Sequence, residues 1–147
     1  MKTATALALV SAASGAVVEQ RQTPTSEFDV TNFSASCQPH SVLCFFGFNV
    51  ATTTSATSCG LTVQGPDLLP AVGLTGCEDP RFSWSFGRAG KDGGAHALTV
   101  TWEATPGGGN LTGSHLVQPA EVVLEFHGSV SGERYVGPAA FVISPLQ

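Results

Sequence analysis

The residues whose chemistry is easiest to define in this sequence are its four cysteines, Cys37, Cys44, Cys59 and Cys77. An even set of widely spaced cysteines in a secreted chain is typical of two disulfides, and four cysteines allow three pairings. Structural zinc sites usually bring cysteines in close pairs such as Cys-x-x-Cys, and no pair here has that spacing. We therefore expect two disulfides and no metal site.

One pairing of the cysteines is favoured by the residues between them. Pro39–Ser41 is a turn-forming stretch, and it would bring the flanking Cys37 and Cys44 to within bridging distance. Cys59 would then pair with Cys77 across a segment rich in glycine and proline. Because this leaves no spare thiol, we expect no covalent dimer.

Catalytic signatures are hard to find among the remaining polar residues. The chain has many serines but no Gly-x-Ser-x-Gly elbow, and no phosphate loop or dinucleotide fingerprint, so we predict no catalytic residue and no cofactor. Glu78 and Asp79 are adjacent and would point to opposite faces of an extended chain, which predicts a solvated turn before Pro80. The histidines, expected to be surface or structural residues, are His40, His96, His115 and His127.

Three aromatic residues could form a binding platform for sugars or phenolic rings: Trp84, Trp102 and Tyr135. Both tryptophans, however, share the parity of neighbouring large apolar residues in their segments. We therefore predict that Trp84 and Trp102 belong to the core.

The elements that position these residues are strands, because apolar and polar residues alternate almost throughout and no segment has a helical period. Residues 81–86 and 96–104 form the clearest pair, a long hairpin with one apolar face. Residues 27–36 change parity midway, which predicts a bulge near Thr31 or Asn32. Residues 44–51 place Phe46, Phe48 and Val50 on the side predicted to be buried and Phe45 on the other, as expected for a strand inside a sheet.

Four further segments have strand patterns, and they are residues 59–64, 114–118, 121–129 and 135–143. In the third segment Val122, Leu124 and Phe126 share one parity and are predicted to point inward. Pro138 in the fourth segment predicts an edge position or a bulge. The predicted loops are 52–58 and 106–113. Seven or eight short strands without a helix predict an all-β fold, either a β-barrel or a β-sandwich.

The first residues predict export. Lys2, a short apolar run and small residues ending at Ala16 are typical of a signal peptide over residues 1–16, followed by a polar lead or pro-segment over 17–26 and one domain over 27–147. No later run reaches the ~18 apolar residues of a membrane helix. We expect a secreted, extracellular protein with no membrane association.

Charge excludes one class of partner. The chain has 6 basic and 11 acidic residues, a net charge of −5, and the basic residues are scattered. Nucleic-acid binding needs clustered Lys and Arg, so we expect no nucleic-acid partner. Two Asn-x-Ser/Thr sequons, at Asn32 and Asn110, are candidate glycosylation sites. Asn110 falls in a predicted exposed loop, whereas Asn32 fits only if the bulge turns it outward.

Two stretches resemble one family. Residues 28–48, FDVTNFSASCQPHSVLCFFGF, and 77–86, CEDPRFSWSF, are similar to the fungal small secreted proteins related to the major Alternaria allergen. The resemblance implies a fungal β-barrel or sandwich that is an allergen, elicitor or effector, or a carrier of small phenolic ligands, and it brings no catalytic motif. In that allergen an unpaired cysteine joins two chains, a feature that four paired cysteines would not allow.

The leading hypothesis is a non-enzymatic secreted interaction protein that binds a host protein or a small ligand. A carbohydrate-binding or cell-wall module is the alternative, and it requires an exposed tryptophan. An uncharacterised hydrolase comes third, and it requires a histidine and a carboxylate within hydrogen-bond reach in a concave site.

Overall fold

The computed structural model of the chain describes residues 27–90 and 94–146. The predicted signal peptide and lead segment, residues 1–26, lie outside the described residues. Within the described part no helix is long and apolar enough to cross a membrane.

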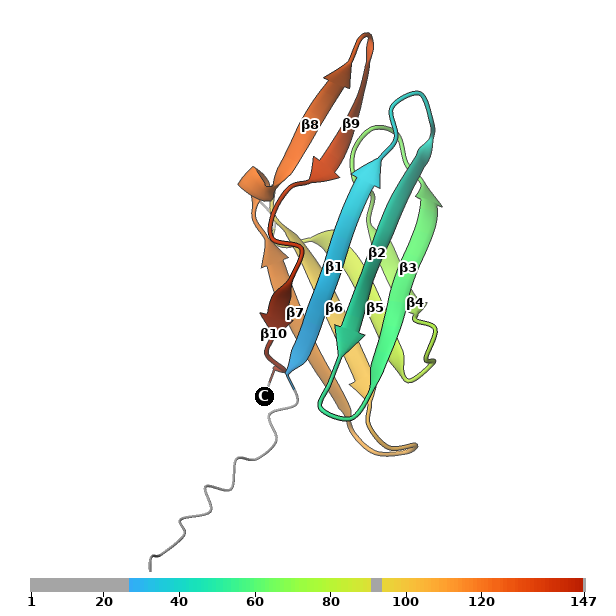
Figure 1. The fold of residues 1–147 in the computed structure, drawn as a ribbon, viewed down its shortest axis with the longest axis vertical. Coiled ribbons are helices and arrows are strands. Elements are labelled where there is room, and N and C mark those ends of the chain that lie inside the picture. The colour runs from blue at the N-terminus through green and yellow to red at the C-terminus, as the bar shows by residue number, and fades with distance from the viewer. Residues whose placement is uncertain (1–26, 91–93, 147) are drawn as a thin grey trace, which may run out of the picture.

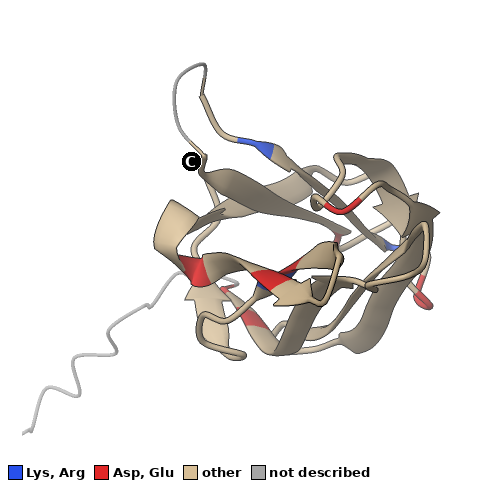
Figure 2. Cartoon of the chain, turned by 90° about the horizontal axis from the view of Figure 1, so that it is seen from above, with Lys and Arg blue, Asp and Glu red and all other residues tan. Residues whose placement is uncertain are grey.

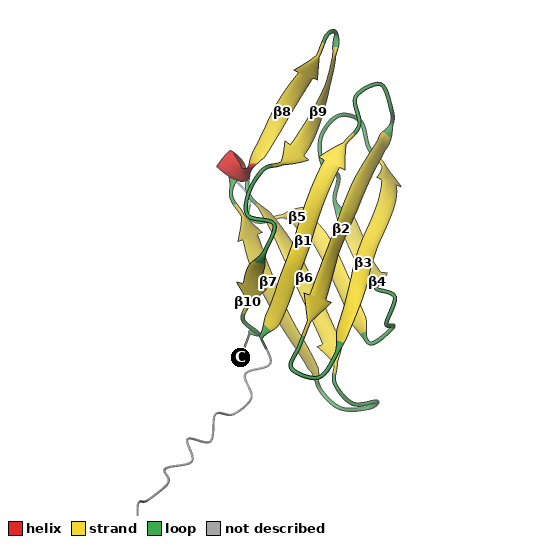
Figure 3. Ribbon diagram, in the orientation of Figure 1, coloured by secondary structure: helices red, strands yellow, loops and turns green. Residues whose placement is uncertain are grey.

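Two antiparallel sheets pack face to face, as Figures 1 and 3 show. The first sheet contains β1 (Phe28–Cys37), β2 (Leu43–Ala51), β3 (Ala56–Gln64), β8 (Val122–His127), β9 (Val130–Tyr135) and β10 (Phe141–Ile143). The second contains β4 (Val72–Gly76), β5 (Phe82–Arg88), β6 (His96–Glu103) and β7 (Asn110–Val117). Their orders are β3-β2-β1-β9-β8, with β10 beside β1, and β4-β5-β6-β7.

The predicted all-β class is confirmed, and of the two architectures the sandwich is the one observed. The sheets do not close into a barrel, although an isolated bridge between Gly113 and Pro145 joins them at one side. The described residues form ten strands rather than seven or eight. The two that the sequence pattern did not reveal are β4 and β9, which are short and carry few large apolar residues.

The core lies between the sheets and is built by aromatic side chains from both. Trp84 of β5 is 0 % exposed, and its ring lies 5.4 Å from that of Phe48 on β2. The ring of Phe46, also on β2, has its centroid 5.1 Å from that of the Phe86 ring on β5. Trp102 is 5 % exposed and stacks on Phe82. The prediction that both tryptophans are core residues is confirmed.

The predicted bulge in the first strand is also present. The register of β1 against β2 shifts between Thr31 and Ser34, and Asn32 has a φ of 54°. The extra residue restores the parity, so Val30 and Phe33 are both buried. As predicted for an interior strand, β2 lies between β1 and β3.

Several predicted boundaries were wrong. Strand β3 begins at Ala56 inside the predicted 52–58 loop, and β7 begins at Asn110 inside the predicted 106–113 loop. The predicted strand over 135–143 is the end of β9 and all of β10, with Pro138 in the connection between them. Threonine, serine and glycine therefore occupy strand positions here because neighbouring strands supply the hydrogen bonds, whatever their own preference.

Candidate binding surface on the β8–β9 hairpin

The β8–β9 hairpin projects past the end of the second sheet, at the top of Figure 1. Leu124 and Phe126 face the same side as the half-buried Val122, but they are 41 % and 74 % exposed. The prediction that they are buried was wrong, and the reason is physical. Their parity is that of the inward face, but the second sheet ends before it reaches them, so none of the described strands covers that face.

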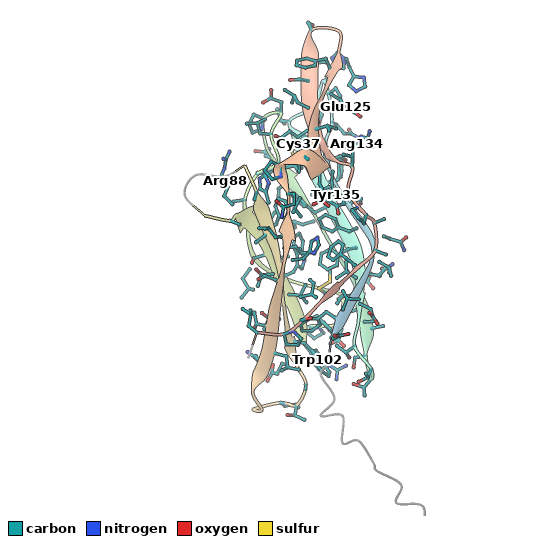
Figure 4. All side chains as sticks on the ribbon, turned by 90° about the vertical axis from the view of Figure 1, so that its left-hand side faces the viewer. Cys37, Arg88, Trp102, Glu125, Arg134 and Tyr135 are labelled. Atoms are coloured by element: carbon teal, nitrogen blue, oxygen red, sulfur yellow. A yellow bond between two sulfur atoms is a disulfide. The ribbon has the colours of Figure 1, made fainter. Side chains whose placement is uncertain are left out.

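The base of the hairpin is fixed to the sandwich by the single tyrosine. The Tyr135 hydroxyl donates to the Pro138 carbonyl oxygen at 2.7 Å, and the ring meets Phe33 edge-on at 4.7 Å. Figure 4 shows Tyr135 directed into the interior below the hairpin, with Trp102 at the opposite end. Burial, with a smaller contribution from the charge of Glu121, raises the pKa of Tyr135 from 10.0 to about 12.

The inner side of the hairpin is held by the loop between β3 and β4. Glu133 donates its backbone N–H to the Asp67 carbonyl oxygen, and its carboxylate accepts the backbone N–H of Leu69, both at 2.7 Å. The Ser131 hydroxyl donates to the Asp67 carboxylate at 3.0 Å. Within the described residues no Lys, Arg or His nitrogen lies within 4.0 Å of either carboxylate. At hydrogen-bond distance these carboxylates are met by the neutral donors Leu69 and Ser131, and Glu133 also acts on His96 by a longer-range electrostatic interaction.

The outer side of the hairpin carries a small charged cluster. The Arg134 Nε donates to Glu125 at 3.0 Å, and its Nη2 forms a further contact with the same oxygen. His127 lies 3.6 Å from the other Glu125 oxygen. The hydrogen bond from Arg134 lowers the pKa of Glu125. The charged groups of the outer face are therefore ion-paired and exposed to solvent, whereas the face with Leu124 and Phe126 is apolar.

An open hollow of about 400 Å³ lies beside the hairpin turn. It is lined by His40, Ser41, Val42, Pro66, Asp67, Ser129, Val130 and Ser131. A histidine, serines and a carboxylate thus share one concavity. The serine–carboxylate bond is the one between Ser131 and Asp67, and none of the hydrogen bonds among the described residues engages the His40 ring. The geometry does not form the nucleophile–base pair that a hydrolase of this kind would use.

The structure does not gather the histidines into one site. His96 is buried and stacks on Phe86 at 5.0 Å, and His115 stacks on Phe141 at 3.7 Å. Burial lowers the pKa of both. His40 and His127 are exposed. Among the described residues no group of three or more His, Cys, Asp or Glu side chains could hold a metal ion.

The other predicted residues have structural positions. Cys37 pairs with Cys44 and Cys59 with Cys77, which confirms the favoured pairing. Glu78 and Asp79 form the predicted turn, where Asp79 makes a 2.7 Å ion pair with Arg81.

Both sequon asparagines are exposed. The bulge turns Asn32 outward, and Asn110 is the first residue of β7 rather than part of a loop. Glycosylation at either position stays a prediction.

The sequence matches no model of a protein family and has no significant match to a curated protein. The resemblance to the proteins related to the major Alternaria allergen therefore stays a prediction. The function of this chain has to be argued from its own surfaces.

Proposed function

We propose that this chain is a secreted, non-enzymatic interaction protein that binds another protein through the inner face of the β8–β9 hairpin. The observation that supports the proposal is the exposure of Phe126, a large aromatic residue on a strand face of inward parity. Aromatic residues are enriched in the buried centres of protein interfaces, and clustered exposed apolar residues mark such surfaces. The sequence resemblance supports a role of the fungal effector-, elicitor- or allergen-like kind.

The hairpin is prepared for binding because it is anchored at its base and along one side. The Tyr135 hydrogen bond and the contacts of Glu133 with the Asp67–Leu69 segment fix its direction. A surface that is already ordered loses less conformational entropy when a partner binds. The hairpin therefore presents Leu124 and Phe126 on an ordered strand face.

A protein partner fits the surface better than a sugar or a phenolic ligand. Trp84, Trp102 and Tyr135 are all buried, so none of them offers the exposed aromatic face on which a sugar could stack. The hollow beside the hairpin is open and, apart from His40, offers no ring for stacking. A convex hairpin with apolar side chains on one face is suited to contact another protein surface.

A retention experiment with matched variants tests the proposal. The wild type, the double variant Leu124→Ser with Phe126→Ser, and the control Leu74→Ser are immobilised and exposed to extracellular proteins of a host plant tissue. Leu74 on β4 is 75 % exposed, so the control removes exposed apolar surface at a position outside the hairpin. We expect the wild type and the control to retain the same proteins, identified by mass spectrometry and then titrated individually, and the double variant to lose them. Equal retention by all three would overturn the proposal.

A further inference from the structure

We propose that β8 binds its partner by strand addition, taking an extended segment that carries apolar residues and Lys or Arg together on one face, at every second position. This inference rests on the proposed function and names the partner's chemistry. It follows from three features of the hairpin and its supporting loop. These are a free strand edge, an uncovered apolar face, and the carboxylates of Asp67 and Glu133, which have no Lys, Arg or His nitrogen of the described residues within 4.0 Å.

The first feature is the direction of the β8 main chain. Val136 donates its N–H to the Glu121 carbonyl oxygen at 2.7 Å, so the groups of the odd-numbered residues of β8 point toward β9. Alternation along the strand then turns the N–H and C=O groups of Leu124 and Phe126 to the opposite side. Strand β8 is the last strand of its sheet. In the described part of the chain, no hydrogen bond engages the Leu124 or Phe126 N–H on that side.

The outer edges of β3, β7 and β4 are covered or interrupted over part of their length. Along β3, the Ser58 carbonyl oxygen accepts the Glu78 N–H at 3.0 Å, and the Cys59–Cys77 disulfide ties this edge to the start of the next turn. Along β7, the Thr112 carbonyl oxygen accepts the Leu146 N–H at 2.7 Å. Strand β4 has five residues and an irregular register. Covering, shortening and bulging are the usual protections of an edge, and β8 has none of them beyond its modest length.

The second and third features define what an added strand should carry. A residue placed opposite Leu124 or Phe126 shares their face, so an apolar side chain there would pack on them. On that same face Glu133 of β9 lies directly opposite Leu124. The Asp67 carboxylate, which accepts a hydrogen bond from Ser131 of β9, lies on the far side of β9 from β8. A Lys or Arg could lay its aliphatic stem along Leu124 and bring its charge toward these carboxylates.

Charge decides between a foreign segment and a second copy of this chain. The hairpin and its supporting loop carry Asp67, Glu121, Glu125 and Glu133 against the single Arg134, and acidic segments lie along the hairpin in Figure 2. A second copy would add the same carboxylates to the interface, in a chain whose net charge is already −5. A basic apolar strand would neutralise them. Complementary charge of this kind selects partners and discourages wrong ones.

The test uses the folded protein and three capped synthetic peptides of equal length. One carries valine and lysine in turn at every second position with threonine between them, one has glutamate in place of these lysines, and the third is the lysine peptide with alternate backbone nitrogens methylated to block strand pairing. Amide hydrogen exchange and chemical shifts are followed by NMR. We expect the lysine peptide to slow exchange at Leu124 and Phe126 by about tenfold or more while the β4 amides are unchanged. The glutamate and methylated peptides should bind roughly tenfold more weakly or not at all.

A variant pair tests the main chain directly. Leu124→Pro removes the outward N–H, and proline is tolerated at that side of an edge strand, whereas Leu124→Val keeps the N–H and a branched apolar side chain. The proline variant should lose peptide binding and the valine variant should keep it. Should the proline variant not fold, the methylated peptide gives the same comparison.

Four outcomes would overturn strand addition. They are equal binding of the lysine and glutamate peptides, shifts without protection of the two amides, absence of binding by the lysine peptide at millimolar concentration, and a concentration-dependent dimer that protects the same amides without peptide. The retention experiment separates this failure from failure of the proposed function. Retention that depends on Phe126 without protection of the β8 edge would sink strand addition alone.

Discussion

Strands β6 and β8 have nearly the same apolar pattern and opposite surroundings. In β6 the residues Leu98, Val100 and Trp102 alternate with polar residues and all three are buried. In β8 the residues Val122, Leu124 and Phe126 also occupy every second position, with Val123 and Glu125 between them, yet exposure rises along the strand toward the hairpin turn. Alternation in a sequence thus reports which residues share a face. Whether that face is covered depends on where the opposite sheet ends.

The comparison also separates what stabilises the molecule from what is available for binding. The body is stabilised by aromatic packing and two disulfides, and the hairpin is attached through Tyr135 and the Asp67–Leu69 segment. Substitutions in the two regions should therefore have different effects. Body substitutions should change the free energy of unfolding, and substitutions on the hairpin face should change binding.

The largest effect is expected for Trp84→Ala. The residue is fully buried on β5 against Phe46 and Phe48 of β2, and truncating a buried aromatic residue leaves a cavity, so the free energy of unfolding should fall by about 3–5 kcal/mol. Urea unfolding followed by circular dichroism measures the loss. A loss below about 1 kcal/mol would contradict the burial of Trp84 between the two sheets.

Removal of the disulfides should come next. Replacing Cys59 and Cys77 by alanine frees a loop of sequence separation 18 and should cost about 3 kcal/mol, because the unfolded chain gains entropy. The matched double variant at Cys37 and Cys44, with a separation of 7, should lose about 2.5 kcal/mol. Urea midpoints in the reverse order would show that strain or local packing, rather than loop length, controls the two contributions.

Alkaline pH should affect the junction between body and hairpin. The folded-state pKa of Tyr135 is raised to about 12, so its contribution to stability is complete below pH 10 and is lost as the pH rises through 12. Tyr135 is the only tyrosine in the chain, and its ultraviolet absorbance therefore reports a single ionisation. A transition near the ordinary pKa of 10.0, without unfolding, would contradict its burial at the hairpin base.

The smallest effect on stability is expected for Phe126→Ser. Because the ring is already 74 % exposed, the free energy of unfolding should change by no more than about 0.5 kcal/mol. The variant is compared with Phe86→Ser, a buried position on β5, which should be strongly destabilised. A Phe126→Ser loss comparable to that of Phe86→Ser would place Phe126 in the core and remove the binding surface.

Local features of the fold could be predicted from the sequence because their causes are local. The parity change around Asn32 requires a bulge, and a turn brings Cys37 to Cys44 across a sequence separation of 7. The hairpin of β5 and β6 follows from alternation alone. By contrast, the bond between Ser131 and Asp67 joins residues 64 positions apart. No local pattern reports such a contact.

The missed part of the candidate site has the same explanation. Strand β9 carries Ser131, Gly132, Glu133 and Arg134, which have weak strand preference, and it exists because β8, β1 and the Asp67 carbonyl oxygen pair with it. One signal was available in retrospect. Glu133 and Arg134 are adjacent, so their charges lie on opposite faces of a strand. A strand with one face in the core would not carry a charge on both faces, so this pair indicates that the inner face is open at Glu133.

Solvent accessibility of individual phenylalanine rings tests the central claim most directly. NMR relaxation of the ring protons by a soluble paramagnetic chelate, in protein with isotope-labelled phenylalanine, measures how closely solvent approaches each ring. We predict strong relaxation at Phe126 and weak relaxation at Phe46 and Phe86, because the first lies beyond the second sheet and the others lie under it. Relaxation of Phe126 as weak as that of Phe86 would show that its face is already covered and would contradict the account of the hairpin as a binding surface.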